Sequence, residues 1–315
     1  MVEANRISVV VRSYTEARWE ELVKSVESAQ RQTIPAEIVL VIDHNPTLYA
    51  RARERFPAAT VIENPYPPGS SQTWNAGITA ATGEMVAFID DDAVAAPDWL
   101  EQLLQHYANP QVVGVGGQIT PVWSNGRPRW FPEEFDWVVG CSYRGLPETV
   151  APVRNLIGCN MSFRRQVLHD IRLFLTDQGL GHVAGQPIGC DETELCIRLR
   201  QQFPDAILLH NPQAVVYHTV PATRARWSYF RSRCYLEGKS KATVSRLVGV
   251  DAGLSAERRH TFKTLPRGFG RGIRDAMFKL DFYGLGRAGA ILAGLSITTA
   301  GYLWGLLTVR RKNAA

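Results

Sequence analysis

Met85-Val-Ala-Phe-Ile-Asp-Asp-Asp92 joins a short hydrophobic run to three consecutive carboxylates. The run from Met85 to Ile89 is typical of a strand buried on both faces, as in a parallel sheet covered by helices. In such sheets, ligands bind at the carboxyl ends of the strands. Packed like charges repel, so a fold keeps three carboxylates there only where a cation compensates them. Because oxygen ligands suit Mg²⁺ and Mn²⁺, the stretch predicts a metal site; the alternative is a solvated acidic turn.

The residues before this stretch alternate between strand and helix patterns. Such alternation is typical of βαβ units in a largely parallel sheet. The predicted fold class is therefore α/β, with a Rossmann-like, mostly parallel sheet flanked by helices. We expect strands at residues 7–11, 38–42, 60–62 and 85–89, helices at residues 16–32, 48–56 and 73–81, and a further helix opened by Pro97.

Two more polar segments follow predicted strands directly. They are Arg12-Ser-Tyr14 and Asp43-His-Asn45. Because the carboxyl ends of parallel strands share one edge of a sheet, we expect both segments to lie near Asp90, Asp91 and Asp92.

The second half of the chain is less regular. Pro121 to Pro152 is rich in proline, glycine and aromatic residues, which predicts a long irregular segment that forms either an acceptor wall or a small aromatic core. Regular structure is expected again at residues 155–163, followed by a helix at 192–202 and strands at 206–209 and 214–217. Residues 224–241 have a basic, aromatic helical pattern.

Composition excludes several classes of protein. The net charge of +5 is mild, and no zinc-finger, helix-turn-helix or RNA-binding motif is present, so we expect no nucleic-acid partner. Five cysteines with no CxxC spacing argue against a disulfide framework or a zinc site. No signal-peptide pattern precedes the first predicted strand.

The tail predicts contact with a membrane. Residues 288–309 carry no charge, and as a helix they would reach about 33 Å, enough for a hydrocarbon core. Basic residues flank both ends, so either a spanning helix or one lying in the inner leaflet fits, whereas an ordinary packed helix fits less well. Gly301 and Gly305 form a GxxxG pair suited to close helix packing. We expect three parts: a ligand-binding and catalytic α/β domain at 1–225, a basic and aromatic helical extension at 226–270, and a membrane-associated tail at 271–315.

Five segments in this order resemble the family 2 inverting glycosyltransferases, which have the GT-A fold. The resemblance covers about residues 5 to 240. The segments are the strand ending in Asp43, Asn75-Ala-Gly77 with Gly83-Glu84, Phe88-Ile-Asp-Asp-Asp92, Gly158-Cys-Asn-Met-Ser-Phe-Arg-Arg165 and Cys190-Asp-Glu-Thr-Glu-Leu-Cys-Ile-Arg198.

The resemblance implies transfer of a sugar from a nucleotide diphosphate donor, with Mn²⁺ or Mg²⁺ as cofactor. It implies a metal site at Asp92 and His218, and a catalytic base at Glu192 or Asp191, whose acid types are swapped relative to the family. An inverting transfer needs one base for the acceptor proton while a metal stabilises the departing diphosphate. The residues implied to contact the nucleotide are Arg12, Ser13, Asp43, Asn75, Asp90 and Asp91.

Departures and finer similarities qualify the implied site. Trp74 stands where the family has an arginine, and Tyr14-Thr15 replaces its usual tyrosine-asparagine pair.

Two further segments, Val41-Ile-Asp-His-Asn-Pro46 and Gly140-Cys-Ser-Tyr-Arg-Gly145, resemble a subgroup similar to glucosyl-dolichyl-phosphate glucuronosyltransferases. That similarity implies a UDP-linked sugar and a lipid-linked or saccharide acceptor, at the cytoplasmic face of the cell membrane.

Two other functions fit part of the pattern. A non-catalytic nucleotide-sugar or carbohydrate-binding protein would keep the three aspartates but need no base at residues 191 and 192. A sugar nucleotidyltransferase would need a glycine-rich basic loop after the first strand, which Arg12-Ser-Tyr-Thr15 does not supply.

Overall fold

The computed structural model describes residues 7–176, 181–183 and 186–312. They divide into two compact units. The sheet unit comprises Met1–Thr120, Pro147–Gly185 and Asp191–His218. The helical unit comprises Pro121–Leu146, Gln186–Cys190 and Thr219–Ala315.

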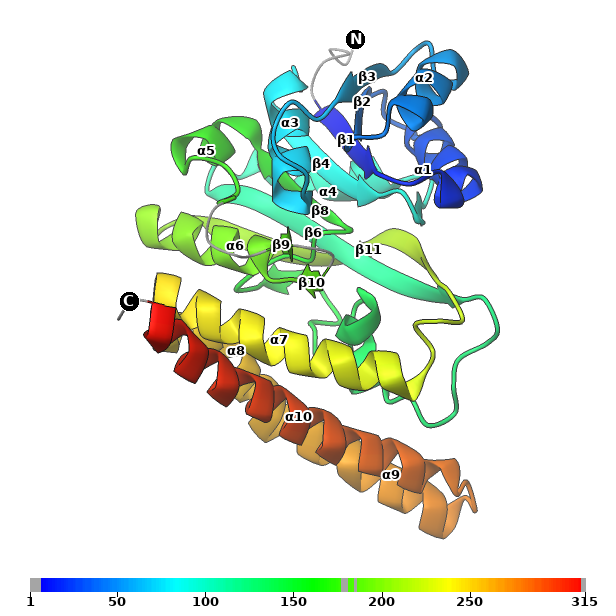
Figure 1. Cartoon of the computed structure of the whole chain (residues 1–315), viewed down its shortest axis with the longest axis vertical. Coiled ribbons are helices and arrows are strands. Elements are labelled where there is room, and N and C mark those ends of the chain that lie inside the picture. The colour runs from blue at the N-terminus through cyan, green and yellow to red at the C-terminus, as the bar shows by residue number, and fades with distance from the viewer. Residues whose placement is uncertain (1–6, 177–180, 184–185, 313–315) are drawn as a thin grey trace. The chain divides into compact units, whose positions relative to one another are not determined.

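Within the described residues, the sheet unit contains a sheet of 9 strands in the order β3-β2-β1-β4-β8-β6-β11-β5, with β7 beside β11 (Figure 1). The first four strands along the chain are mutually parallel, as expected. Their bounds are Ile7–Ser13 for β1, Glu37–Ile42 for β2, Thr60–Glu63 for β3 and Met85–Asp90 for β4.

The later strands of the sheet run antiparallel to their neighbours, which the strand–helix alternation did not predict. β8 is antiparallel to both β4 and β6, and β11 is antiparallel to β5 and β7. The bounds are Ala93–Ala95 for β5, Val112–Trp123 for β6, Ala151–Pro152 for β7, Met161–Arg164 for β8 and Ile207–Val220 for β11. Two short strands, β9 and β10, comprise Gly181–Val183 and Gln186–Ile188.

The prediction of two strands at residues 206–209 and 214–217 was wrong, because β11 is one continuous strand. Pro212, which lacks a backbone donor, lies between the part of β11 that pairs with β7 and the part that pairs with β5. The missing donor therefore interrupts neither of these pairings.

Helices of the sheet unit pack on the strands through small and apolar residues. A Cβ at Gly77 of α3 would lie 2.2 Å from Val10 of β1, so only glycine allows this approach. Val10 and Phe88 share their core cluster with Leu195 of α6. The bounds are Trp19–Gln30 for α1 after the 3₁₀ turn Glu16–Arg18, Pro46–Arg55 for α2, Ser70–Ala80 for α3, Trp99–Leu104 for α4, Arg165–Asp170 for α5 and Asp191–Gln202 for α6.

One helix begins later than predicted. Pro97 precedes α4, whose N-cap is Asp98 and whose first residue is Trp99. Asp98 and Pro97 therefore belong to the turn that leads into the helix.

The helical unit is built from helices and one aromatic core. The segment expected to be irregular contains the 3₁₀ helix Glu133–Val139, and its Phe131 and Phe135 are buried against Phe230. The small aromatic core expected for this segment is therefore present, and a role of the segment in acceptor binding stays a prediction. The helices are α7 (Trp227–Val248), α8 (Val250–Arg259), a π turn (His260–Thr264), α9 (Leu265–Phe278) and α10 (Tyr283–Lys312).

Glycines bring α10 against α7 at backbone distance. A Cβ at Gly301 would lie 2.1 Å from the carbonyl oxygen of Tyr235, and one at Gly238 would lie 2.0 Å from that of Thr298. A Cβ at Gly305 would lie 3.2 Å from Cα of Lys239. The close packing predicted for the GxxxG pair is therefore confirmed, between two helices of one chain.

Gly301→Ala is expected to destabilise the helical unit by at least about 2 kcal/mol, because the new methyl group overlaps a carbonyl that cannot rotate away. Gly289→Ala is the matched control in the same helix, since a Cβ there meets nothing within 4 Å. It is expected to stabilise α10 by up to about 1 kcal/mol through helix propensity. Urea unfolding followed by circular dichroism measures both, and equal midpoints for the two variants would contradict the packing described here.

Candidate active site

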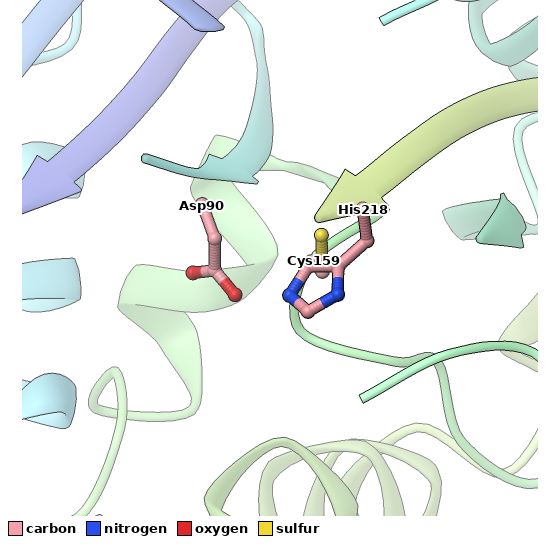
Figure 2. A group of neighbouring side chains, drawn as sticks. All are labelled: Asp90, Cys159 and His218. Atoms are coloured by element: carbon pink, nitrogen blue, oxygen red, sulfur yellow. The ribbon is translucent and has the colours of Figure 1, made fainter. Parts of the chain in front are cut away.

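Acidic side chains from the end of β4 meet a histidine from β11. The Nε2 atom of His218 lies 3.2 Å from Oδ1 of Asp92, and both side chains are buried. Figure 2 shows Asp90, Cys159 and His218 extending toward one another from separate elements. The carboxylate of Asp90, Sγ of Cys159 and a ring nitrogen of His218 all lie within 4.8 Å of one another.

These residues fit a divalent cation. Asp92 lies beside the imidazole of His218, and Asp90 and Cys159 lie near a nitrogen of the same ring; carboxylates and imidazole are usual ligands of such an ion. The structure therefore brings together the predicted metal ligands Asp92 and His218, and it adds Asp90 and Cys159 to the group.

Two arginines compensate part of the negative charge. Nη1 of Arg18 lies 2.8 Å from Oδ1 of Asp91 and 2.9 Å from Oδ2 of Asp92. Nε of Arg12 lies 3.1 Å from Oδ1 of Asp90. Burial alone would lower the pKa of Arg18, but Asp91 and Asp92 raise it above its usual value. Three carboxylates at this position therefore do not by themselves require a metal ion, and the prediction of a metal site depends on His218 and on the geometry.

Asp91 is turned away from the group that contains His218. Its Oδ2 accepts a hydrogen bond of 2.6 Å from Oγ of Ser13, and its side chain is buried. Burial raises the pKa of Asp91 to about 7, although Arg18 opposes this shift. Asp91 and Ser13 were both expected to contact the nucleotide; the structure pairs them with each other.

Asp43 organises the loop between β3 and α3. Its Oδ1 accepts a hydrogen bond of 2.7 Å from Nδ2 of Asn64, and its Oδ2 accepts one of 3.0 Å from the backbone nitrogen of Gly69. Nδ1 of His44 lies 2.9 Å from Oδ1. A carboxylate has about four lone-pair positions, so Asp43 retains capacity to accept from a base.

Trp74 supports Arg12. The guanidinium carbon of Arg12 lies 4.2 Å from the centroid of a Trp74 ring, a cation–π contact. Nη1 of Arg12 is buried and has no hydrogen-bond partner among the described residues. Trp74, which departs from the family pattern, therefore supports the positive charge of Arg12 beside Asp90.

Asn75 does not join this group. Its Nδ2 donates to the carbonyl of Phe174 at 2.9 Å, and its Oδ1 accepts from the backbone nitrogen of Phe174 at 3.0 Å. Both ends of the amide hold the backbone of another segment, so the structure places Asn75 in a structural contact.

Asp191 begins α6 and is held by two serines. Oγ of Ser71 donates to its Oδ2 at 3.0 Å, and Oγ of Ser70 lies 3.3 Å from the same atom. Burial alone would raise the pKa of Asp191, but the hydrogen bond from Glu192, the charge of Arg12 and Ser71 lower it. The net effect lowers the pKa of Asp191 and favours its ionised form.

Sequence reasoning missed four residues of the site. Arg18 lies in a 3₁₀ turn with no recognisable pattern, and the pairing of Cys159 with Asp90 depends on the tertiary fold. Ser70 and Ser71 open α3 after Pro67-Pro-Gly69, and small polar residues at a helix start are a signal that was available.

Comparisons with known proteins identify similar chains. The model of the family "Glycosyl transferase family 2" matches residues 8–172. A glucosyl-dolichyl phosphate glucuronosyltransferase of Haloferax volcanii is 36% identical over 247 residues, which cover 77% of this chain and 78% of that protein. The succinoglycan biosynthesis protein ExoM of Rhizobium meliloti is 24% identical over 260 residues, which cover 79% and 77% of the two chains.

Solved structures agree in fold. A mannosyltransferase from Pyrobaculum calidifontis, in complex with GDP-Man and Mn²⁺, superposes with a TM-score of 0.59 and 18% identity, over 95% of this chain and 87% of that chain. GalNAc-T7 with UDP, GalNAc and Mn²⁺ gives a TM-score of 0.55 and 18% identity, over 83% and 55%. The predicted α/β fold class of the GT-A type is confirmed.

Proposed function

This chain belongs to glycosyl transferase family 2, and from that premise we propose that it moves a sugar from a UDP-linked donor to a hydroxyl of a lipid-linked saccharide, at the cytoplasmic face of a membrane. The family and the enzyme class predicted from the five motifs are confirmed. The donor, the acceptor, the membrane face and the roles of individual residues are parts of the proposal.

The position of Arg12 carries the proposal. Its Nε binds Asp90 of the candidate metal group, and its charge lowers the pKa of Asp191. The guanidinium of Arg12 therefore lies within electrostatic reach of both Asp90 and Asp191, which are more than 90 residues apart in the sequence. A binding protein would need only the first group, whereas a transferase needs both.

We assign the metal to Asp90, Asp92 and His218, with Cys159 beside them. A divalent ion bound there would neutralise charge on the departing diphosphate. Carboxylates suit Mn²⁺ and Mg²⁺, while imidazole nitrogen and sulfur suit softer ions, so this donor set favours Mn²⁺ over Mg²⁺. Both solved structures named above contain Mn²⁺.

We assign the base to Glu192. It takes the proton from the acceptor hydroxyl while that oxygen bonds to the anomeric carbon from the face opposite the leaving diphosphate, so the configuration inverts. Asp191, ionised and fixed by Ser71, orients Glu192. Arg12 adds positive charge near the diphosphate, and Asp43 contacts the nucleobase. A lipid phosphate oxygen would be ionised already and need no base, so a base favours a sugar hydroxyl as acceptor.

The test is a screen by isothermal titration calorimetry of UDP-, GDP- and dTDP-sugars with Mn²⁺, Mg²⁺ or EDTA. We expect one UDP-sugar to bind with Mn²⁺ and to lose at least about tenfold in affinity in EDTA, since the carboxylates would hold the metal and the metal would bind the diphosphate. Failure of every nucleotide sugar to bind with either metal would overturn the proposal. Binding without transfer to any lipid-linked saccharide would favour the non-catalytic alternative, and release of pyrophosphate from UTP and a sugar phosphate would favour the nucleotidyltransferase.

A further inference from the structure

Large apolar side chains are exposed at the turn that joins α9 to α10. Phe278 is 77% exposed, Leu280 74% and Phe282 70%. Met277, Tyr283 and Leu285 are exposed beside them. We call residues 277–285 the hairpin tip. So dense a run of exposed apolar residues is unusual on a soluble surface and marks a site of protein or membrane contact.

The hairpin is rigid behind its tip. A Cβ at Gly272 of α9 would lie 2.5 Å from the carbonyl oxygen of Gly284 in α10, so the two helices touch at backbone distance. Nη2 of Arg287 lies 2.9 Å from Oδ2 of Asp281 and 3.2 Å from Oδ2 of Asp275. The apolar tip is thus presented by a fixed frame with its charges paired behind it.

The net charge of the segment that contains the hairpin tip indicates which kind of partner the tip would contact. Residues 258–287 contain eight lysines and arginines and two aspartates, a net charge of +6, whereas the whole chain has +5. Residues 224–246 carry the same net charge, with seven lysines and arginines and one glutamate, so this segment is one of two strongly basic stretches in the second half of the chain. A basic segment that carries an exposed apolar tip complements the anionic headgroups and acyl chains of a bilayer.

The packing of α10 argues against a helix that crosses the bilayer. Residues 283–308 are long and apolar enough to span one, and only 28% of the most apolar window is buried. The helix is nevertheless seated on α7 at backbone distance. The stretch of α7 from Tyr235 to Ala242, which contacts α10, includes Lys241, whose partners are Glu237 at 3.4 Å and Glu257 of α8 at 2.8 Å. A spanning α10 would have to leave α7 or draw these charges into hydrocarbon, and both are costly.

We propose that the hairpin tip enters one leaflet of an anionic bilayer, and that α10 returns on the same side without crossing it. This deepens the membrane part of the proposed function and needs no assumption about donor or acceptor.

The first experiment is co-sedimentation with vesicles of phosphatidylcholine containing phosphatidylglycerol. The double variant Phe278→Ser with Phe282→Ser is expected to lose about 100-fold in partitioning, because each side chain removes a large apolar area from water on insertion. The matched control is Val122→Ser with Val250→Ser, two valines of the helical unit that are about half exposed, and it is expected to bind like the unchanged protein. Pure phosphatidylcholine should bind all forms weakly.

Equal partitioning of the tip variant and the control would overturn the proposal. Calorimetric donor binding and circular dichroism of the same samples check that each variant is folded. Those measurements need no lipid. A protein that binds donor but not vesicles would therefore contradict only the proposal that the hairpin tip enters a bilayer. A protein that binds vesicles but no donor would contradict only the proposed function.

The second experiment tests the side on which the chain ends. The five native cysteines are buried, so the background of a membrane-impermeant maleimide is expected to be low. In sealed membrane vesicles, Ser124→Cys and Ala315→Cys are expected to be labelled to the same extent. Labelling of one from outside and of the other only after detergent would show that α10 crosses the membrane.

Discussion

Asp92→Asn is expected to lower kcat at least about 1,000-fold and to remove tight Mn²⁺ binding. The substitution keeps the shape of the side chain but removes the charge that lies 3.2 Å from Nε2 of His218. Charge stabilisation by a metal in a transfer step is worth several kcal/mol, and about 4 kcal/mol corresponds to a factor of 1,000. Steady-state kinetics across a Mn²⁺ titration, with paramagnetic resonance of free Mn²⁺, measures both effects.

Asp91→Asn is the matched control, one residue away. Asp91 accepts from Ser13 rather than approaching His218, so its variant is expected to lose less than about tenfold in Mn²⁺ affinity. If the two variants behave alike, the division of the three aspartates into a metal-facing pair and an inward member is wrong.

Glu192→Gln is expected to lower kcat by about 10²–10⁴ while donor affinity stays within about threefold. Glutamine preserves the size of the side chain but accepts no proton from the acceptor hydroxyl. Because the acceptor proton moves only in the transfer step, the loss is expected in kcat and not in donor binding. Single-turnover transfer to a lipid-linked saccharide, beside calorimetric donor binding, separates the two.

Asp191→Asn tells the base from its partner. The pKa of Asp191 is lowered against the effect of burial, so it is ionised in the working enzyme and opposes the ionisation of Glu192. Without that charge, Glu192 loses its proton more easily, and the acid limb of the pH–rate profile is expected to move to lower pH. If instead Asp191→Asn abolishes the limb and Glu192→Gln leaves it in place, Asp191 is the base.

Local pattern was sufficient to predict the parallel half of the sheet. The strands β1, β2 and β4 are apolar runs, interrupted only at Ser8 of β1, with polar residues at their ends, and each was predicted within one or two residues of its observed bounds. The antiparallel strands β5, β7 and β8 carry no comparable signal, because they are only two to four residues long. β8, for example, pairs with both β4 and β6 although Met161–Arg164 is only four residues long.

The candidate site shows the same division. Asp90 to Asp92 follow a strong strand pattern and could be found from the sequence alone. Arg18 and Cys159 could not, since their importance depends on which segments the fold places side by side. Trp74 was noted from the sequence only as a departure from the family pattern, and the structure shows Arg12 stacked on its ring.

The glycine contacts between α7 and α10 bear on how the protein can be prepared for study. Ending the chain before Tyr283, a common remedy for poor solubility, would remove α10, the helix that packs on α7. It would also uncover Phe135, since a Cβ at Gly294 of α10 would lie 2.4 Å from that ring. The shortened protein would expose this second apolar surface and would still carry Phe278, Leu280 and Phe282 of the hairpin tip. Serine substitutions at Phe278 and Phe282 leave α10 seated and are the better route to a well-behaved sample.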